Sequence, residues 1–319
     1  MVAIFRGFMA RSCRPVRRRG RSARVLRRAR AFVRPTRMVM SLIAAVACVS
    51  APGIAAADGI MLVPAGAFWM GRADGGSEEA PQHRVFVADF WIERYKVTNA
   101  EFAGFLNAQG LVLAERQRRF DDDDPDARIH EIRLDTPPGP GHGQPVRWIA
   151  DPGFEHHPAV EVSWFGARDY CAWKGRRLPS EAEWEKAARG DDRRRYPWGS
   201  APPTPERAVF ARRYNDTDRG DVRPGGASPY GVQDLVGNLR EWTASMLLPY
   251  PYRTDDGRDR FTGQGRVVVR GASHDDAADT LGVTTRRSHD RRGADAGHHN
   301  VGFRCATSED LGEVAPGER

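Results

Sequence analysis

The amino-acid sequence predicts an α+β fold with low regular secondary structure. Short apolar runs bounded by turn residues dominate the chain, and such runs are typical of brief β-strands. Clear helix starts are few. Glycine and proline contribute 33 and 22 of the 319 residues, spread through the chain without a repeat or a low-complexity block. These observations together favour one compact domain with many irregular connections.

Four strands are expected near the start of this domain, where apolar residues alternate with turn formers. They correspond to residues 61–64, 67–71, 84–87 and 90–92.

Two helices begin at capping boxes, in which a hydroxyl accepts from the third backbone N–H and a Glu side chain accepts from the first residue's N–H. Thr98 and Glu101 open a helix over residues 100–106. Ser180 and Glu183 open a second one. Both starts are strong local signals.

The second helix should end at Gly190, a residue suited to a helix C-terminus. A third helix is expected to begin after Ser163 and to run to Trp173. Its inward face would hold Ala167, Tyr170, Cys171 and Trp173.

The segments 107–157 and 243–265 are rich in Asp, Pro and Gly and are expected to be loops. Within the first, the acidic run 121–124 is more typical of a solvated loop than of a cation site. The polar tail 308–319 is expected to be disordered.

The charge of the whole chain is misleading about its partners. The 319 residues contain 49 basic and 42 acidic side chains, but 13 of the arginines precede residue 58, where no acidic residue occurs. Residues 58–319 therefore carry 49 − 13 = 36 basic against 42 acidic groups, a net charge of −6. This mildly acidic domain gives no support for nucleic-acid binding.

Residues 1–57 are interpreted as an export leader. An apolar stretch over 38–49 follows arginines and ends before Ala55-Ala56-Ala57, an A-x-A cleavage pattern. Three alternatives remain open: a true start at Met38 or Met40, lipoprotein processing at Cys48, and a retained anchor. The domain 58–307 is expected in the periplasm or secreted, without a transmembrane span in the mature form.

Beyond the leader the chain has just two cysteines, Cys171 and Cys305. In an oxidising compartment two cysteines most simply form one disulfide.

Three groups of motifs occur in a characteristic order. The first contains Met61-Leu62-Val63-Pro64-Ala65-Gly66 and Tyr95-Lys96-Val97-Thr98-Asn99. The second runs from His157-Pro158-Ala159-Val160-Glu161-Val162-Ser163-Trp164 through Tyr170-Cys171-Ala172-Trp173 to Arg177-Leu178-Pro179-Ser180-Glu181. The third contains Tyr230-Gly231-Val232-Gln233-Asp234, Gly237-Asn238-Leu239-Arg240-Glu241-Trp242, Arg270-Gly271-Ala272-Ser273 and Gly302-Phe303-Arg304-Cys305.

Over residues 60–306 these motifs resemble the formylglycine-generating enzyme, or sulfatase-modifying factor, family. The resemblance implies a variant of the C-type-lectin-like fold. The family includes the enzyme itself, a non-catalytic paralogue, a domain of ergothioneine-forming sulfoxide synthases and a periplasmic protein of pyoverdine maturation. It also implies a Cys171–Cys305 disulfide.

The resemblance places the family's copper-binding cysteine pair shortly after the Gly-Gly-Ser motif. The matching positions here fall near Asp276 and Leu281, and no cysteine lies within two residues of either. Because a thiolate pair suits Cu(I), the family's copper-dependent oxidation is not expected, and neither copper nor iron is expected as a cofactor.

Polar residues gather instead in this loop, and Ser273, His274, Asp275 and Asp276 are the candidate catalytic residues. His289, His298 and His299 follow them. A histidine with carboxylates can hold Fe(II) in a facial triad. The alternative is a polar surface pocket without a metal.

Calcium is the expected cofactor. The resemblance assigns side-chain ligands to Asp234 and Glu241, and carbonyl ligands to Gly237 and Leu239. Oxygen ligands suit calcium. The family's other calcium site falls near 209–218, where Val209 stands close to an expected Asn and leaves no ligand set assigned.

Five tryptophans within the motifs are expected in the core, with room for one exception, rather than on a carbohydrate-binding surface: Trp164, Trp173, Trp184, Trp198 and Trp242.

Three functions remain open. The first is an accessory or maturation factor that binds a protein or peptide partner in the periplasm. The second is a non-canonical metal-dependent oxidase or protein-modifying enzyme that uses the region 274–276. The third, a carbohydrate- or ligand-binding lectin-like module, rests on fold alone.

Overall fold

A computed structural model describes residues 59–113, 117–135, 145–260, 265–290 and 297–309. The predicted leader 1–57 and most of the predicted tail lie outside the described residues. None of the helices in the described ranges is long and apolar enough to cross a bilayer.

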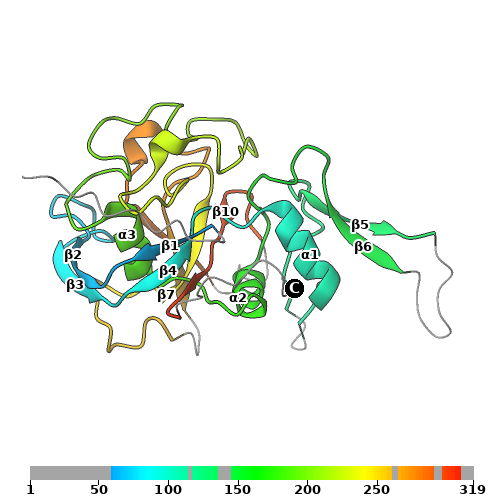
Figure 1. Ribbon diagram of the computed structural model, residues 1–319, viewed down its shortest axis with the longest axis horizontal. Helices are drawn as coiled ribbons and strands as arrows, with labels where there is room; N and C mark the ends of the chain where they lie inside the picture. The colour runs from blue at the N-terminus through cyan, green and yellow to red at the C-terminus, as the bar shows by residue number, and fades with distance from the viewer. Residues whose placement is uncertain (1–58, 114–116, 136–144, 261–264, 291–296, 310–319) are drawn as a thin grey trace, which may run out of the picture. The chain divides into compact units, whose positions relative to one another are not determined.

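The described residues form a mixed α+β structure in which helices and short strands alternate with long connections (Figure 1). The α-helices are α1 (Asn99–Gln109), α2 (Trp164–Trp173) and α3 (Glu181–Arg189). Two 3-10 turns are η1 (Pro224–Gly226) and η2 (Ala278–Thr280). The strands are β1 (Ile60–Val63), β2 (Gly66–Met70), β3 (His83–Val87), β4 (Phe90–Glu93), β5 (Ile129–Arg133), β6 (Val146–Ala150), β7 (Arg240–Met246), β8 (Arg266–Arg270), β9 (Arg286–Asp290), β10 (Val301–Gly302) and β11 (Ala306–Thr307).

The strands pair in four small sheets. One has the order β1-β4-β11 and joins the start of the domain to its end. The largest has the order β10-β7-β8-β9, with β10 parallel to β7 and the other pairs antiparallel. The hairpins β2-β3 and β5-β6 complete the set. Figure 1 shows β5 and β6 extending beyond α1, away from the other sheets.

The predicted helix starts are confirmed. Thr98 and Ser180 are the N-caps of α1 and α3, and each forms a complete capping box with the Glu three residues later. Ser163 caps α2 by accepting from the Gly166 N–H. Helix α1 extends to Gln109, three residues beyond the predicted end at Leu106.

Two apolar clusters form the core. One gathers α1, α2 and the end of the chain around Phe102, Tyr170 and Phe303, all at most 2% exposed. The other packs α3 against the β2-β3 hairpin around Phe68 and Trp184, both fully buried.

Two expectations about regular structure are wrong. The segments predicted as loops contain the β5-β6 hairpin and part of β7. Four of the five residues of β5 are at least partly exposed, so the hairpin has little apolar alternation to reveal it in the sequence. Trp173 was predicted in the core but is 45% exposed, because it lies at the last position of α2.

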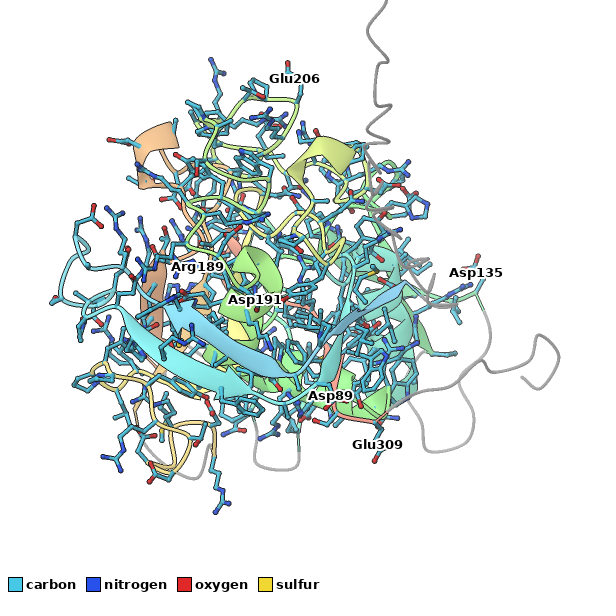
Figure 2. The ribbon with its side chains drawn as sticks, turned by 60° about the vertical axis from the view of Figure 1, so that its left-hand side comes forward. Asp89, Asp135, Arg189, Asp191, Glu206 and Glu309 are labelled. Atoms are coloured by element: carbon cyan, nitrogen blue, oxygen red, sulfur yellow. A yellow bond between two sulfur atoms is a disulfide. The ribbon has the colours of Figure 1, made fainter. Side chains whose placement is uncertain are left out.

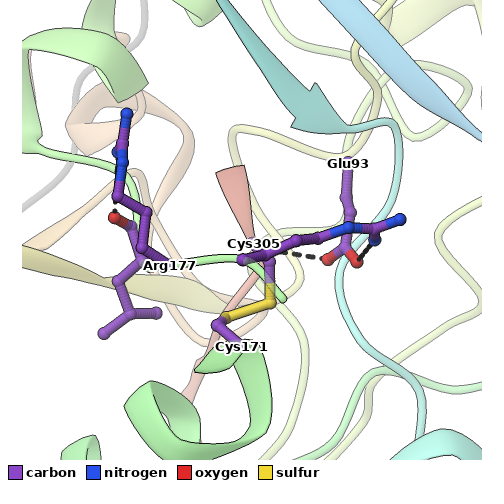
Figure 3. Close-up of a disulfide and its surroundings, with 6 residues drawn as sticks. Glu93, Cys171, Arg177 and Cys305 are labelled. Carbon is purple, nitrogen blue, oxygen red and sulfur yellow. Dashed lines mark hydrogen bonds and ion pairs between the residues drawn. A yellow bond between two sulfur atoms is a disulfide. The ribbon is translucent and has the colours of Figure 1, made fainter. Parts of the chain in front are cut away.

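Cys171 of α2 and Cys305 between β10 and β11 form a disulfide across 134 residues (Figure 3). The backbone N–H of Cys305 donates to Glu93 at 2.8 Å, and Glu93 also pairs with Arg176. The bond therefore ties α2 to the sheet that contains β4.

Helix α3 is anchored by buried charge as well as by its apolar face. Arg189, at its C-terminal end beside the β2-β3 hairpin, donates to the carbonyls of Trp69 and Gly71 and to Glu185 (Figure 2). The Glu185 carboxylate also forms an ion pair with Arg270 of β8.

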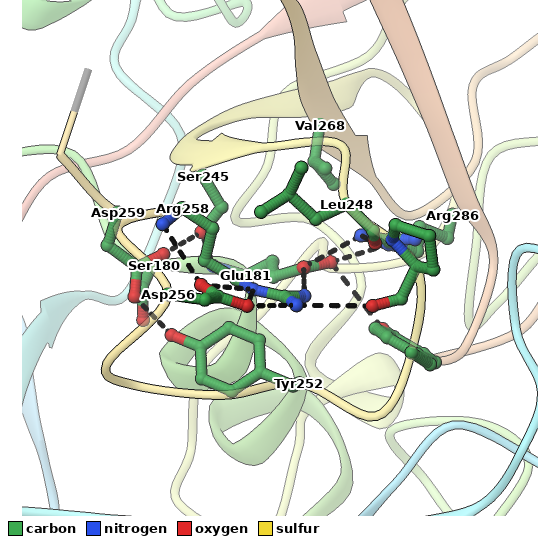
Figure 4. A network of polar contacts seen from close by, with 12 residues as sticks. Ser180, Glu181, Ser245, Leu248, Tyr252, Asp256, Arg258, Asp259, Val268 and Arg286 are labelled. Carbon is green, nitrogen blue, oxygen red and sulfur yellow. Dashed lines mark hydrogen bonds and ion pairs between the residues drawn. The ribbon is translucent and has the colours of Figure 1, made fainter. Parts of the chain in front are cut away.

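At the N-terminal end of α3, the Glu181 carboxylate accepts hydrogen bonds from Nε and Nη2 of Arg286, at 2.7 and 2.9 Å (Figure 4). Arg258 approaches the same carboxylate at 3.3 Å.

Candidate functional site

The predicted catalytic loop begins where β8 ends. Gly271 has φ of +80°, and a Cβ there would lie 2.6 Å from the carbonyl oxygen of Leu235. Glycine is therefore required for this turn. It directs the next residues back toward the β7 end of the sheet, where Ser273 and His274 are fully buried.

Ser273, Asp275 and Asp276 lie in one hydrogen-bonded cluster. The Ser273 hydroxyl bonds to Asp275 and lies 3.0 Å from Oδ2 of Asp276. Asp276 pairs with Arg240 at 2.7 Å and with Arg287 at 3.1 Å. The two arginines neutralise the Asp276 carboxylate, and this pairing is consistent with a structural role for it.

His274 is held separately by one backbone carbonyl. Its N–H and its ring Nδ1 lie 2.8 and 2.9 Å from the carbonyl oxygen of Asn238. Its Nε2 is buried and has no hydrogen-bond partner among the described residues. The imidazole therefore keeps one nitrogen for a ligand that the protein itself does not supply.

Of the three later histidines, His299 is the one that reaches this loop. Its Nε2 lies 3.7 Å from Oδ2 of Asp275, and its ring centroid lies 6.1 Å from that of His274. His289 and His298 stack on each other near Trp242 instead. The structure thus brings together His274, Asp275 and one later histidine.

The electrostatics of this region favour a charged Asp275 and a neutral His299. Burial raises the pKa of Asp275, but the Ser273 hydroxyl and the charge of Arg240 outweigh it and hold this pKa below its usual value. Burial lowers the pKa of His299, although Asp275 opposes that shift. A neutral imidazole beside a carboxylate can accept a proton or bind a metal.

Two acidic residues that the sequence analysis missed also lie close to His299. Asp126, Glu161 and His299 each present a ligand atom, and these atoms lie within 4.8 Å of one another. Burial, together with Asp124, Asp121 and Asp126, raises the pKa of Glu161 to about 8. The available signal was Glu161 itself, a charged residue between Val160 and Val162 in an apolar run.

The predicted calcium ligands lie close together but around an internal cation. Nζ of Lys96 lies 3.0 Å from Oδ2 of Asp234 and 3.5 Å from Oε1 of Glu241, and it also bonds to the Asp234 carbonyl. Arg304 donates to both oxygens of Glu241, at 2.7 and 2.9 Å.

Gly237 and Leu239, the expected carbonyl ligands, lie in the turn before β7. Gly237 has φ of +93°, and a Cβ there would lie 2.3 Å from the Val209 carbonyl oxygen. Between the two residues, Asn238 donates to Asp234 at 2.9 Å. With Lys96 between the carboxylates, the residues as they lie do not fit a calcium ion, because like charges would meet in a buried site. Calcium at these residues is an expectation from the resemblance alone, and the geometry favours Lys96 as their cation.

A cavity of about 560 Å³ lies on a different face, between α2, α3 and β3. Trp164, Leu178 and Tyr252 contribute apolar surface, and charged side chains surround them: Arg168, Arg176, Arg177, Glu183 and Asp259. Phe86, 64% exposed, stands at its edge. A second cavity of about 550 Å³ is lined by arginines and polar residues near η2. Neither is lined by residues 273–276.

Comparison with known proteins gives a consistent result. Residues 49–309 match the sulfatase-modifying factor enzyme 1-like domain. The inactive Cα-formylglycine-generating enzyme 2 of Mus musculus is 34% identical over 77% of this chain and 84% of its own length. The formylglycine-generating enzyme of Thermomonospora curvata is 31% identical over 78% of this chain and 93% of its own. The structure of PvdO from Pseudomonas aeruginosa aligns with a TM-score of 0.58 and 26% identity, covering 78% and 93% of the two chains.

Proposed function

Since this chain belongs to the sulfatase-modifying factor enzyme 1-like family, we propose that it is an exported maturation factor that binds a polypeptide partner. It would do so without the copper-dependent oxidation of formylglycine-generating enzyme. The finer description of its fold as C-type-lectin-like is part of the same proposal.

One observation carries this proposal: no thiolate pair is left for copper. The only cysteines of residues 58–319 are Cys171 and Cys305, and they are joined in a fully buried disulfide. The loop that matches the family's copper-binding segment contains Asp276, which forms ion pairs with Arg240 and Arg287. Soft thiolate ligands are therefore replaced by a neutralised carboxylate, which does not suit Cu(I).

The cavity edged by Phe86 supports the binding part of the proposal. A lining that combines apolar side chains with charged groups of both signs suits an extended polypeptide, whose side chains need apolar contacts and whose backbone needs polar partners. A partner in the periplasm fits the leader pattern and the disulfide, since disulfides persist in oxidising compartments.

The test uses a photo-crosslinking residue at position 86 in the producing cell. We expect a crosslink to a discrete polypeptide, lost when Ala172→Trp fills the cavity lined by that residue. The matched control carries the crosslinker at Val222, 47% exposed and outside the cavity lining. Equal products from positions 86 and 222 would contradict the proposal.

A parallel assay supplies copper, oxygen and a cysteine-containing sulfatase peptide to the purified chain. We expect no aldehyde product, and turnover to formylglycine would overturn the proposal. A metal-dependent modifying activity is the second candidate. It is favoured by His299, which lies 3.7 Å from Asp275 and has its ring centroid 6.1 Å from that of His274, and it would appear as a modified partner in the crosslinked product.

A further inference from the structure

Buried carboxylates in this protein follow a pattern with two exceptions. Six acidic residues of the described ranges are at least about nine-tenths buried as whole residues: Asp126, Glu161, Glu181, Glu185, Glu241 and Asp276. Four of them each have two basic partners: Glu181 with Arg258 and Arg286, Glu185 with Arg189 and Arg270, Glu241 with Lys96 and Arg304, and Asp276 with Arg240 and Arg287. This pairing is expected, because an uncompensated buried charge is costly.

Asp126 and Glu161 are the exceptions. Among the described residues neither forms an ion pair with Lys or Arg, although they are 9% and 2% exposed. Among the described residues, the hydrogen bond that the Asp126 carboxylate accepts comes from a neutral group, the Asn215 amide at 3.1 Å. The two carboxylates share one site without a cation from the protein.

His299 adds a nitrogen to this site. It lies within 4.8 Å of the carboxylate oxygens, and the Tyr214 ring packs on its imidazole with centroids 3.9 Å apart. Two ligands of one metal ion at about 2.1 Å from it lie roughly 3 to 4 Å apart. Small side-chain rotations would therefore bring all three ligand atoms onto one ion.

A second observation, independent of the acidic residues, also indicates a ligand. The fully buried His274 has no hydrogen-bond partner for Nε2 among the described residues. Because Nδ1 is bonded to Asn238, Nε2 lies on the opposite edge of a ring whose neighbour is His299. Oδ2 of Asp126 and Oδ1 of Asn215 are also buried without a described partner. Buried polar atoms without a partner therefore occur on Asp126, on Asn215 that bonds to it, and on His274 beside His299, and such atoms call for an ion or ordered water.

We propose that Asp126, Glu161 and His299 bind one divalent transition-metal ion. Two carboxylates supply the negative charge that such an ion requires, and the imidazole favours Mn²⁺, Fe²⁺ or Zn²⁺ over Ca²⁺. The site is distinct from the expected calcium site, where Lys96 and Arg304 already neutralise the carboxylates. It does not depend on the proposed partner binding.

The three ligands leave further coordination positions to water or to a bound group. Asp275 lies 3.7 Å from Nε2 of His299, on the side of the loop that bears Ser273. A metal here would therefore lie beside the residues predicted to be catalytic. That position is suited to activating a bound water or orienting a substrate oxygen.

The experiment titrates the metal-stripped full chain with Zn²⁺, Mn²⁺ and Co²⁺ by calorimetry, and follows the visible absorption of Co²⁺. We expect one ion per chain. Glu161→Gln and His299→Ala should each weaken binding by at least about tenfold. His130→Ala is the matched control, because His130 is an exposed histidine beside Asp151, and it should bind as the unaltered chain does.

The folded state of each variant is checked by near-UV circular dichroism and by the intact disulfide. Glu161→Gln has a second readout. Without metal, at neutral pH, it should be about as stable as the unaltered chain, because the raised pKa of Glu161 already leaves that carboxyl mostly protonated. With saturating metal it should lack the rise in thermal midpoint that the unaltered chain shows. Absence of stoichiometric binding, or binding undiminished in both variants, would overturn the proposal.

Discussion

The ammonium nitrogen of Lys96 lies between two buried carboxylates, 3.0 Å from Asp234 and 3.5 Å from Glu241, with 1% of its side chain exposed. These carboxylates are the side-chain ligands that the resemblance assigns to calcium. The protein therefore supplies its own cation at that place, and this relationship can be tested directly.

We expect Lys96→Gln to destabilise the protein by about 3–5 kcal/mol in calcium-free buffer, because it leaves buried carboxylates without a compensating charge. Urea unfolding in the presence of a chelator measures the effect. Lys174→Gln, at an exposed lysine, is the matched control and should leave the midpoint almost unchanged.

Adding calcium to Lys96→Gln and to the unaltered chain tests whether the two carboxylates bind the lysine or a calcium ion. In Lys96→Gln, Asp234 and Glu241 become available, so millimolar calcium should raise the midpoint. In the unaltered chain it should not, since Lys96 already holds the position. A calcium-dependent rise in the unaltered chain, absent after Glu241→Gln, would instead support calcium at the family position.

Glu181 offers a second test of buried charge. It receives Arg286 through two hydrogen bonds and Arg258 through one (Figure 4). We expect Glu181→Gln to cost about 3–5 kcal/mol, because both guanidinium groups lose their buried counter-charge. Glu206→Gln, at a fully exposed loop position labelled in Figure 2, should leave the midpoint unchanged. Equal midpoints for the two variants would contradict this account.

The Cys171–Cys305 disulfide should contribute through the unfolded chain. A bond that closes a 134-residue separation is worth about 3–5 kcal/mol in the chain-entropy model. We expect the Cys171→Ala, Cys305→Ala double variant to lose stability in this range under oxidising conditions. With reductant, the unaltered chain should fall toward the double variant. A double variant as stable as the oxidised chain would show that packing around Cys171 dominates.

Local chemistry explains which elements the sequence could predict. The starts of α1 and α3 follow from Thr98 and Ser180, whose side chains bond to the next turn whatever surrounds them. The exposed β5-β6 hairpin carries no apolar alternation, so the same reasoning classed it as a loop. Trp173 looked like a core residue from its motif, yet its place at the end of α2 leaves it exposed.

The candidate site was partly predictable for a similar reason. Ser273 to Asp276 are neighbours in the sequence, so their clustering needed no knowledge of the fold. Glu161 and His299 are joined only by tertiary packing, seen in the Glu161 N–H that donates to the His298 carbonyl. Lys96, distant in sequence from Asp234, could not be recognised as their cation before the fold was known.

His289 should make stability depend on pH in the acid range. Burial, assisted by His298 and the arginines Arg240, Arg266 and Arg287, lowers the pKa of His289 to about 4. The unfolded chain binds a proton near pH 6.5, whereas the folded chain resists it. Stability is therefore fully present above about pH 6.5 and falls as the pH drops toward 4.

We expect His289→Gln to reduce this loss by about 1–2 kcal/mol, a value discounted because the ring is partly exposed. Urea midpoints measured from pH 7 to pH 4 test it. His130→Gln is the control, since the His130 side chain is 48% exposed, and its curve should follow that of the unaltered chain. If His289→Gln keeps the full acid slope, then other groups cause the loss. The acid loss would then come from titratable groups other than the His289 imidazole, which stacks on His298.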